Sequence, residues 1–458
     1  MNRNQLVFLN MVSATVFFIL RHLIWIERPN FQSRIHQLQQ QWTEDNDDSS
    51  SILQTSIPVN DDSVVTENDK HNDSENSTRD YNFAFGENKA YFYKYEPDRL
   101  PLPDSVSLQN AHGIYVSNDC SDQDHLECGP TIVITYQDKV DDSKCLLQWK
   151  AGEYDQPAKF LGPGSSLCAG VPHGLTAMEE VDAKKDGKGA RTTTYLYHAN
   201  NDQHLSKTTA DGEVVWTNQY QPPVPLDKNS TEPEFKPTWF AGQPHSPYIY
   251  LADGYGTSRI YQYYKSNGTY AGRYFGGIGT DDGFFHTSHA ISWDGRNSDN
   301  DDDDGHSTMI VCDRENHRLS YFAIDPKQPE KFEFLGQQNM EPYNLYQPCN
   351  IRYHPTTKQA IIPFLEGSVG IFNPPNPDEP LVQPLEGILN ITDQMGKLGF
   401  LHPHDAHFLP NGDFVLVTWA PGRIGYFRKV EGGKVEEKKS AAPSDRDPFG
   451  HANTTSIQ

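Results

Sequence analysis

The sequence predicts an all-β fold, a six-bladed β-propeller, preceded by a disordered N-terminal stalk. Three observations lead to this expectation. Beyond residue 82, short runs rich in Val, Ile, Tyr, Phe and Thr alternate apolar with polar residues and end at Gly, Pro, Asn or Asp, as strands and turns do. No long run with the helical period of about 3.6 residues interrupts them. A pattern of strand, polar turn and strand then recurs, which is typical of propeller blades.

The predicted blades follow one another in chain order. They contain residues 110–148, 194–207, 252–263, 312–322, 360–373 and 418–427. The third, fourth and sixth match best, because each combines an apolar strand, a polar turn, an Arg followed by Ile or Leu, and then aromatic residues. The first blade is the least regular. We expect the propeller to occupy 82–432.

The remaining segments have a different texture. Residues 1–27 combine a basic residue with an apolar run, which indicates a signal peptide or a signal anchor, and we favour the uncleaved anchor. Residues 28–81 are polar with few large apolar side chains, which predicts a disordered linker. We expect a disordered tail over 433–458.

Charge and cysteine content limit the partners and the compartment. A formal net charge of −24, with no basic stripe, excludes a nucleic-acid-binding role. Six cysteines in a chain that enters the secretory pathway predict disulfides, and the pairs Cys120 with Cys128 and Cys145 with Cys168 are close enough in sequence to form. The acidic run over 299–304 is either a solvated insertion, which we favour, or a calcium-binding loop.

Acceptor triplets for N-linked glycans agree with that compartment. They begin at Asn72, Asn76, Asn229, Asn267, Asn390 and Asn453. We therefore expect a lumenal or extracellular glycoprotein, either anchored in the membrane as a single-pass type II protein or secreted.

Three histidines recur in similar settings at almost equal intervals. His173, His289 and His404 are separated by 116 and 115 residues, and each stands just before an apolar strand. The innermost strand of a blade lines the central channel, so blades two, four and six would each direct one imidazole to the axis. Three neutral imidazoles with one open position hold a catalytic zinc ion. The alternative is that each histidine caps a strand in a wet channel; three in matched positions favour the metal.

Several motifs resemble those of the peptidylglycine α-amidating lyases, which are six-bladed propellers of the NHL-repeat kind. The motifs are Val171-Pro-His-Gly-Leu-Thr, Ala252-Asp-Gly-Tyr-Gly-Thr-Ser-Arg-Ile, His286-Thr-Ser-His-Ala-Ile, Cys312-Asp-Arg-Glu-Asn-His-Arg-Leu and Pro403-His-Asp-Ala. The similarity runs over about 110–429, with the motifs in the family's order and with similar spacing. Such enzymes split a peptidyl-α-hydroxyglycine into a peptide amide and glyoxylate.

The resemblance implies a role for particular residues. It assigns zinc to His173, His289 and His404, a metal-linked catalytic role to Tyr255, and a catalytic role to Arg314. It also implies a structural calcium ion bound by Asp405 and the carbonyl group of Leu175. The chemistry suits these residue types, because zinc would acidify the substrate hydroxyl, a tyrosinate would take its proton and an arginine would pair with the substrate carboxylate. The alternatives are a stacking role for Tyr255 and an inter-blade salt bridge for Arg314.

The sequence departs from the family pattern in the first blade and around the tyrosine. Where the family has a second arginine, this chain has Gln137-Asp-Lys, and Lys139 would replace the charge without the bidentate geometry. Gly256 stands where the family has a cysteine, so one family disulfide is absent. We expect the hydroxyglycine substrate to come from a separately encoded hydroxylating monooxygenase or from another source.

Two other function classes stay open. One is a different metal-dependent propeller hydrolase of the lactonase kind, which would need Asp or Glu on the axis. The other is a non-catalytic propeller of the NHL kind that binds protein or glycan.

Overall fold

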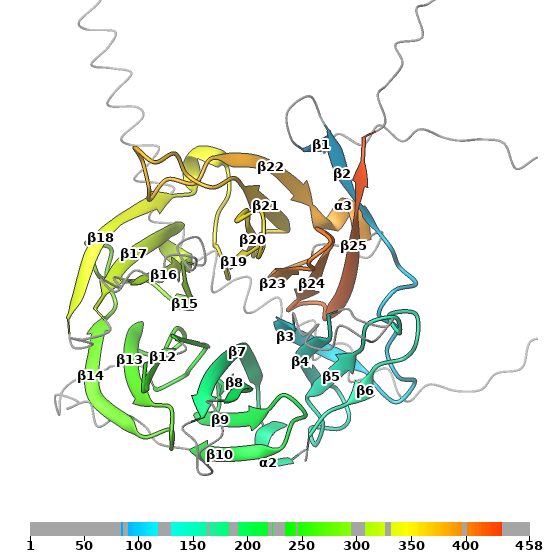
Figure 1. Cartoon of the computed structure of the whole chain (residues 1–458), viewed down its shortest axis with the longest axis horizontal. Coiled ribbons are helices and arrows are strands. Elements are labelled where there is room, and N and C mark those ends of the chain that lie inside the picture. Colours follow the sequence, from blue (N-terminus) through cyan, green and yellow to red (C-terminus); the bar gives the residue numbers. More distant parts are fainter. Residues whose placement is uncertain are drawn as a thin grey trace, which may run out of the picture. The chain divides into compact units, whose positions relative to one another are not determined.

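A computed structural model of the chain shows six antiparallel sheets arranged in a ring (Figure 1). The structure describes residues 84–85, 90–117, 130–162, 165–168, 170–182, 191–218, 222, 234–243, 246–294, 307–325, 331–395 and 401–432. These sheets confirm the prediction of an all-β, six-bladed propeller. The predicted signal segment, linker and tail lie outside the described residues, as do Cys120, Cys128 and four of the six glycan acceptors. Within the described part of the chain, no helix is both long and apolar enough to span a membrane.

The first three blades have four strands each. Blade 1 contains β3 (Leu108–Val116), β4 (Ile132–Asp138), β5 (Leu146–Trp149) and β6 (Lys159–Phe160). Blade 2 contains β7 (Pro172–Asp182), β8 (Arg191–Asn200), β9 (His204–Thr209) and β10 (Val214–Asn218). Blade 3 contains β11 (Trp239–Gly242), β12 (Tyr248–Ala252), β13 (Arg259–Tyr264) and β14 (Tyr270–Gly276).

The other three blades follow the same order, and the last has an extra strand. Blade 4 contains β15 (Ser288–Trp293), β16 (Ser307–Asp313), β17 (Arg318–Ile324) and β18 (Phe332–Asn339). Blade 5 contains β19 (Arg352–Tyr353), β20 (Ala360–Phe364), β21 (Ser368–Phe372) and β22 (Leu385–Asn390). Blade 6 contains β23 (Pro403–Phe408), β24 (Phe414–Thr418) and β25 (Arg423–Glu431), then β2 (Tyr91–Tyr95) and β1 (Ala84–Phe85). Short helical turns lie between strands: α2 (Ser165–Cys168), η4 (Arg314–Asn316), η5 (Glu341–Tyr343) and α3 (Ile391–Met395).

Blade 6 joins the two ends of the propeller. Strand β2 pairs antiparallel with β25, so that Tyr91 lies opposite Glu431 and Tyr95 opposite Phe427. The N-terminal strands therefore form the outer edge of a blade whose inner strands come from the C-terminal part. This closure seals the ring between the first and last blades, and the repeat pattern in the sequence did not reveal it.

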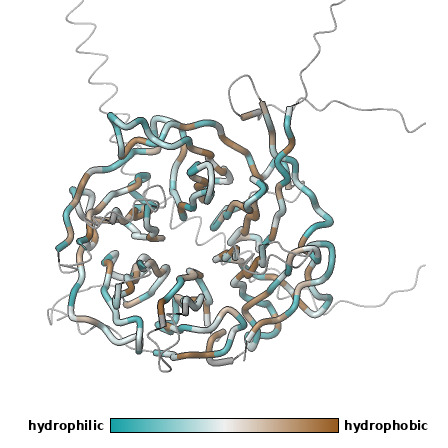
Figure 2. The backbone as a smooth tube through the Cα atoms, in the orientation of Figure 1, coloured by the Kyte–Doolittle hydropathy of each residue, from teal (hydrophilic) through white to brown (hydrophobic). Residues whose placement is uncertain are grey.

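Position within a blade explains the residue pattern of each strand. The middle strands β20 and β24 are buried along their whole length, because neighbouring blades cover both faces of the sheet. The outer strand β18 alternates exposed with half-buried residues, as expected for a strand with one face in water. Hydrophobic segments consequently recur in each sheet around the ring (Figure 2).

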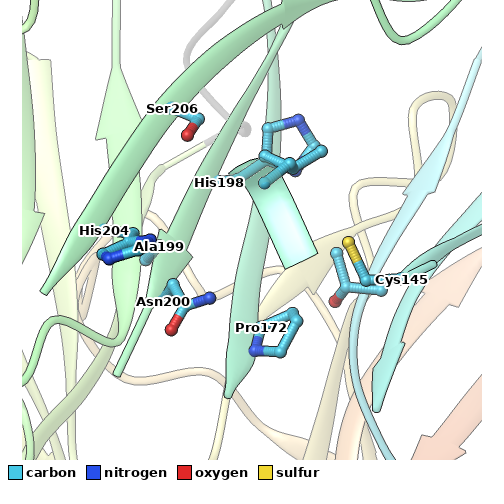
Figure 3. A pocket seen from close by; sticks show the side chains of 9 residues that line it. Cys145, Pro172, His198, Ala199, Asn200, His204 and Ser206 are labelled. Carbon is cyan, nitrogen blue, oxygen red and sulfur yellow. The ribbon is translucent and has the colours of Figure 1, made fainter. Parts of the chain in front are cut away.

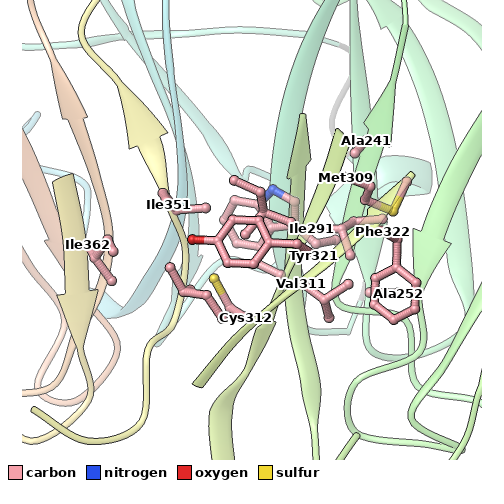
Figure 4. Close-up of a cluster of buried hydrophobic side chains, with 14 of the residues drawn as sticks. Ala241, Ala252, Ile291, Met309, Val311, Cys312, Tyr321, Phe322, Ile351 and Ile362 are labelled. Atoms are coloured by element: carbon pink, nitrogen blue, oxygen red, sulfur yellow. The ribbon is translucent and has the colours of Figure 1, made fainter. Parts of the chain in front are cut away.

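The apolar core runs between the blades. One cluster joins blades 3, 4 and 5 and includes Cys312, Tyr321, Ile351 and Ile362 (Figure 4). Burial among these side chains raises the pKa of the Cys312 thiol well above its usual value. The thiol is therefore a packing group in this core.

A disulfide joins Cys145 in blade 1 to Cys168 in α2, as the sequence suggested. The bond closes a sequence separation of 23 residues, and loops of this size are stabilised by about 3 kcal/mol when they are cross-linked. A cavity of about 10 Å³ lies beside it, lined by His198, Asn200 and Pro172 among others (Figure 3). Its size suits at most one water molecule.

Candidate metal centre

Four buried histidines converge from the inner strands of four blades. His112 comes from β3, His173 from β7, His289 from β15 and His404 from β23, and none is more than 1% exposed. The ring centroids of His173 and His289 are 5.1 Å apart, and that of His404 lies 4.6 Å from each of them. The structure thus brings the three predicted histidines together and adds a fourth.

A β-bulge occurs at each of these histidines. The pairing register of the inner strand shifts between Pro172 and Leu175, between Ser288 and Ala290, and between Pro403 and Asp405. In β3 it shifts between Ala111 and Ile114. A bulge leaves a residue out of the ladder and re-aims its side chain. The four imidazoles are therefore placed by the same local device.

Glycine follows the histidine in blades 1 and 2 because the backbones approach closely there. A Cβ atom on Gly113 would lie 2.5 Å from the Leu175 nitrogen, and one on Gly174 would lie 2.2 Å from the Thr238 oxygen. A larger residue at Gly113 would push β3 from β7, and one at Gly174 would push β7 from the start of β11.

Backbone carbonyl groups of the next blade fix three of the rings in one orientation. The Nδ1 atoms lie 2.9, 2.7 and 3.0 Å from carbonyl oxygens, in the pairs His173 with Thr238, His289 with Cys349, and His404 with His112. A carbonyl only accepts hydrogen bonds, so each Nδ1 carries the proton and each Nε2 keeps its lone pair. Metal-binding histidines are commonly oriented in this way.

The three predicted ligands are held in their neutral form. Burial lowers the pKa of His173, His289 and His404 well below the usual value; His112 adds to the effect at all three, and Arg314 adds to it at His173 and His289. The rings are therefore neutral at physiological pH, which is the form that binds metal. The Nε2 atom of His404 is buried and has no hydrogen-bond partner. A zinc ion fits this donor set, because it would satisfy that atom and binds imidazole nitrogen.

Tyr255 and Arg314 border the histidine cluster. The Tyr255 hydroxyl lies 2.9 Å from Nε2 of His289 and 3.3 Å from Nε2 of His173, and Arg314 donates to it from Nη1 over 3.1 Å. Burial raises the pKa of the phenol, and the Arg314 guanidinium opposes that effect. Arg314 itself is held by Glu315, 3.0 Å away. The two predicted catalytic residues thus contact each other and, through Tyr255, the cluster.

A tight turn and a short helical turn position these two side chains. Tyr255 lies in the turn between β12 and β13, where the Asp253 carboxylate accepts from the backbone N–H of Thr257 in the same turn and from that of Lys236, which precedes β11. Arg314 is the first residue of η4, directly after β16. The Asp-Gly-Tyr and Asp-Arg-Glu-Asn motifs therefore form equivalent turns in two adjacent blades, which brings Tyr255 and Arg314 together.

Sequence reasoning missed His112. Its ligand atom and those of His173 and His404 all lie within 4.8 Å of one another, so these three form a second possible metal-binding group. Two signals were available. His112-Gly-Ile repeats the local pattern of His173-Gly-Leu, and it precedes His173 by 61 residues, about half of the interval noted between the predicted ligands.

A pocket of about 430 Å³ opens over the cluster. Its lining includes His112, His173, His404, Tyr255, Arg314, Asn110, Gln137, Val171, Asn201, Leu365 and Trp419. Among the described residues that line the pocket, Arg314 is the one with a permanent charge. Gln137 faces the pocket and its amide lies 3.0 Å from that of Asn110, whereas Lys139 is exposed and does not line it. The expectation that Lys139 replaces the family's second arginine therefore has no support in the geometry.

The groups expected to bind calcium lie together but contact a guanidinium. Arg352 donates from Nη2 to the carbonyl oxygen of Leu175 over 3.0 Å and lies 3.5 Å from Oδ2 of Asp405. A calcium ion bound to the same two oxygens would lie about 2.3–2.6 Å from each and would collide with that nitrogen. The residues present therefore do not fit this ion.

The two described glycan acceptors lie at the surface. Asn267 is exposed in the turn between β13 and β14, and its side-chain oxygen accepts from the Thr269 amide over 3.0 Å. Asn390 is half-buried at the end of β22. The glycosylation of both residues remains a prediction.

Comparisons with known proteins do not identify the function of this chain. No family model and no curated protein matches the chain. Among solved structures, a putative 6-phosphogluconolactonase from Bacteroides uniformis is 14% identical, with a TM-score of 0.42, covering 74% of this chain and 92% of its own.

Two further structures are similar to the same extent. A luciferin-regenerating enzyme is 10% identical with a TM-score of 0.40, covering 75% of this chain and 95% of its own. The RRP9 WD40 repeats are 9% identical with a TM-score of 0.40, covering 76% of this chain and all of theirs. At these values the neighbours carry no argument about the site.

Proposed function

We propose that the protein is a zinc-dependent lyase that cleaves a peptidyl-α-hydroxyglycine, or a small molecule of that type, to an amide and glyoxylate. One observation carries the proposal. The Tyr255 hydroxyl lies within hydrogen-bonding distance of two axial histidines and of Arg314, and all these groups except His289 line the same pocket. A base, a cation and neutral metal ligands are thus combined as this reaction requires.

The proposed zinc ligands are His173, His289 and His404. The support is their shared geometry, in which a carbonyl group fixes Nδ1 and leaves Nε2 facing the cluster. At His112 the Nδ1 atom makes no such bond to a carbonyl oxygen, and a backbone interaction with Pro172 acts on its ring instead. We therefore propose that His112 packs against the site and is not one of its ligands.

The reaction divides between Tyr255 and Arg314. When bound, zinc would act as a Lewis acid that makes the substrate hydroxyl more acidic. Tyr255 enters the step as the tyrosinate, which the Arg314 guanidinium favours against the effect of burial and which a bound zinc ion would favour further, its phenol proton having passed to solvent. The tyrosinate oxygen accepts the hydroxyl proton, the C–O bond becomes the aldehyde C=O bond, and the C–N bond breaks with its electrons passing to nitrogen. The nitrogen takes that proton from the Tyr255 hydroxyl and leaves as the amide, which restores the tyrosinate. Arg314 stabilises the charged tyrosine oxygen and orients the substrate carboxylate.

The pocket lining limits the substrate. Arg314 supplies one cation, and the first blade supplies the neutral side chains of Asn110 and Gln137. A substrate with one carboxylate near the reacting carbon and an uncharged, hydrogen-bonding remainder suits this lining.

The remaining expectations are proposals of the same kind. We propose that a separately encoded hydroxylating monooxygenase supplies the substrate and that the protein works in the secretory pathway, as a membrane-anchored or secreted glycoprotein. The observation that bears on the hydrolase alternative is the state of Asp405, whose two carboxylate oxygens already accept hydrogen bonds from Ile114, Asn350 and Arg352.

The test measures glyoxylate released from an α-hydroxyglycine peptide by the zinc-loaded protein. Tyr255→Phe should lower kcat by about 10²- to 10⁴-fold, the usual contribution of a general base, and keep its zinc. Tyr264→Phe, an exposed tyrosine of β13, is the matched control and should be unaffected. A zinc-loaded wild type that releases no glyoxylate would rule out the lyase, and a protein that binds no zinc would favour the non-catalytic propeller.

A further inference from the structure

A buried ion pair lies beneath the histidines, among the inner strands. Asp405 is fully buried in β23, and Arg352, in β19, is 16% exposed. Asp405 directly follows the predicted ligand His404 along β23. The pair lies outside the proposed reaction.

The Arg352 guanidinium contacts groups from four other blades. Its Nη2 atom lies 3.4 Å from the carbonyl oxygen of Ile114 in blade 1, 3.0 Å from that of Leu175 in blade 2 and 3.5 Å from Asp405 in blade 6. Its central carbon lies 5.5 Å from the ring of Trp239 in blade 3. One side chain of blade 5 thereby links most of the ring.

Both oxygens of the Asp405 carboxylate accept hydrogen bonds. Its Oδ1 accepts from the Asn350 amide over 2.7 Å, and its Oδ2 accepts from the Ile114 backbone nitrogen over 2.8 Å in addition to Arg352. Each partner donates and none accepts, which is the environment of an ionised carboxylate. A metal ion would meet N–H groups here, whereas calcium requires about six to eight oxygen ligands.

The carbonyl oxygens of Ile114 and Leu175 and the carboxylate of Asp405 nevertheless form a cage for a cation. Three oxygens from three blades converge on one point, and the point is taken by a positively charged nitrogen. The resemblance to the amidating lyases assigns calcium to two of these three groups. The three oxygens thus already face a positive charge, which a side chain supplies.

We infer that Arg352 supplies, from the chain itself, the positive charge at this position, and that the propeller folds and stays closed without calcium. The guanidinium balances Asp405, satisfies the carbonyl groups of blades 1 and 2, and ties blade 5 to the junction between the first and last blades. This inference is independent of the reaction catalysed at the histidines.

The test uses the purified full-length protein, elemental analysis and thermal unfolding with and without CaCl₂. The wild type should contain well under one equivalent of calcium. Its Tm should not move when CaCl₂ is added. For a site with a micromolar Kd, a CaCl₂ concentration about 1,000-fold above that Kd would stabilise the fold by about 4 kcal/mol. Arg352→Met removes the charge and keeps the length, so it should have a lower Tm that CaCl₂ partly restores. Arg428→Met, an exposed arginine paired with Glu96, is the matched control and should not respond.

Two results would overturn the inference. One is a wild-type Tm that rises with CaCl₂ and no longer rises in Asp405→Asn, since that would locate a calcium ion at this carboxylate. The other is a folded Arg352→Met protein whose Tm ignores CaCl₂. If Arg352→Met does not fold, Arg352→Lys serves in its place. It keeps the charge, so it should fold without a calcium response, and a calcium response in that variant would count against the inference.

Discussion

The axis of the propeller carries two layers that treat positive charge in opposite ways. The histidine layer consists of His112, His173, His289 and His404. The arginine layer consists of Arg352, Asp405 and the carbonyl groups of Ile114 and Leu175. Asp405 follows His404 by one residue, and Ile114 and Leu175 follow His112 and His173 by two, on the same strands. Arg352 comes from β19, which carries none of the four histidines. The histidine layer offers the lone pairs of neutral rings, whereas the arginine layer contains a cation that is a side chain of the protein, the Arg352 guanidinium. Adjacent positions of one repeat can therefore serve ligand binding and ring stability separately.

The largest effect should come from breaking the arginine layer. Asp405→Asn leaves the Arg352 guanidinium without its counter-charge, and breaking a buried pair in this way costs about 3–5 kcal/mol of unfolding free energy. Denaturant unfolding measures this change. The zinc content should stay at the wild-type value, because the Asp405 carboxylate bonds to Ile114, Asn350 and Arg352 and the four imidazoles keep their own partners.

The exposed residue Asp98 provides the control for that experiment. Asp98→Asn should change the unfolding free energy by less than about 0.5 kcal/mol, as surface substitutions usually do. Loss of zinc from Asp405→Asn together with a small change in stability would contradict the separation of the two layers.

Breaking the histidine layer should affect zinc far more than stability. His404→Ala and His289→Ala should each weaken zinc affinity by more than about 100-fold, since loss of a mere orienting partner already costs about 10- to 100-fold. His112→Ala is the matched control, because His112 is equally buried and contacts His173 and His404. Its zinc affinity, measured by competition with a chelating dye, should fall by less than about 10-fold. The reverse ranking of His112 and His289 would show that the second possible group holds the metal.

The smallest effect concerns the pH dependence of the metal-free protein. Burial lowers the pKa of His112 from 6.5 to about 4, so the unfolded chain takes up a proton between these values and the folded chain does not. Stability is therefore full above pH 6.5 and falls as the pH decreases through this window. His112→Gln should make that fall shallower by about 1.4 kcal/mol per pH unit, as measured by denaturant unfolding at several pH values. An unchanged slope would mean that His112 is already charged in the folded protein.

The sequence predicted the fold and much of the site because both depend on local patterns. Alternation and turn residues mark each blade, and the Pro-His and Asp-Gly-Tyr motifs mark single bulges and turns. Two features escaped because they depend on contacts between distant segments. Arg352 follows an ordinary apolar residue, and only the closed ring brings it to Leu175, 177 residues earlier. The pairing of β2 with β25 likewise leaves no local signal.

Closure through β2 also sets the order in which the chain can mature. Tyr91 and Phe92 leave the ribosome long before Val430 and Glu431, their partners in blade 6, have been made. Until then β2 has no sheet to join, and the apolar faces of blades 1 and 5 have no sixth blade between them. Contacts of such separation form late and slowly, so a nascent propeller presents open strand edges during synthesis. The same arrangement holds the two ends of the finished ring together through the backbone hydrogen bonds of β2 with β25.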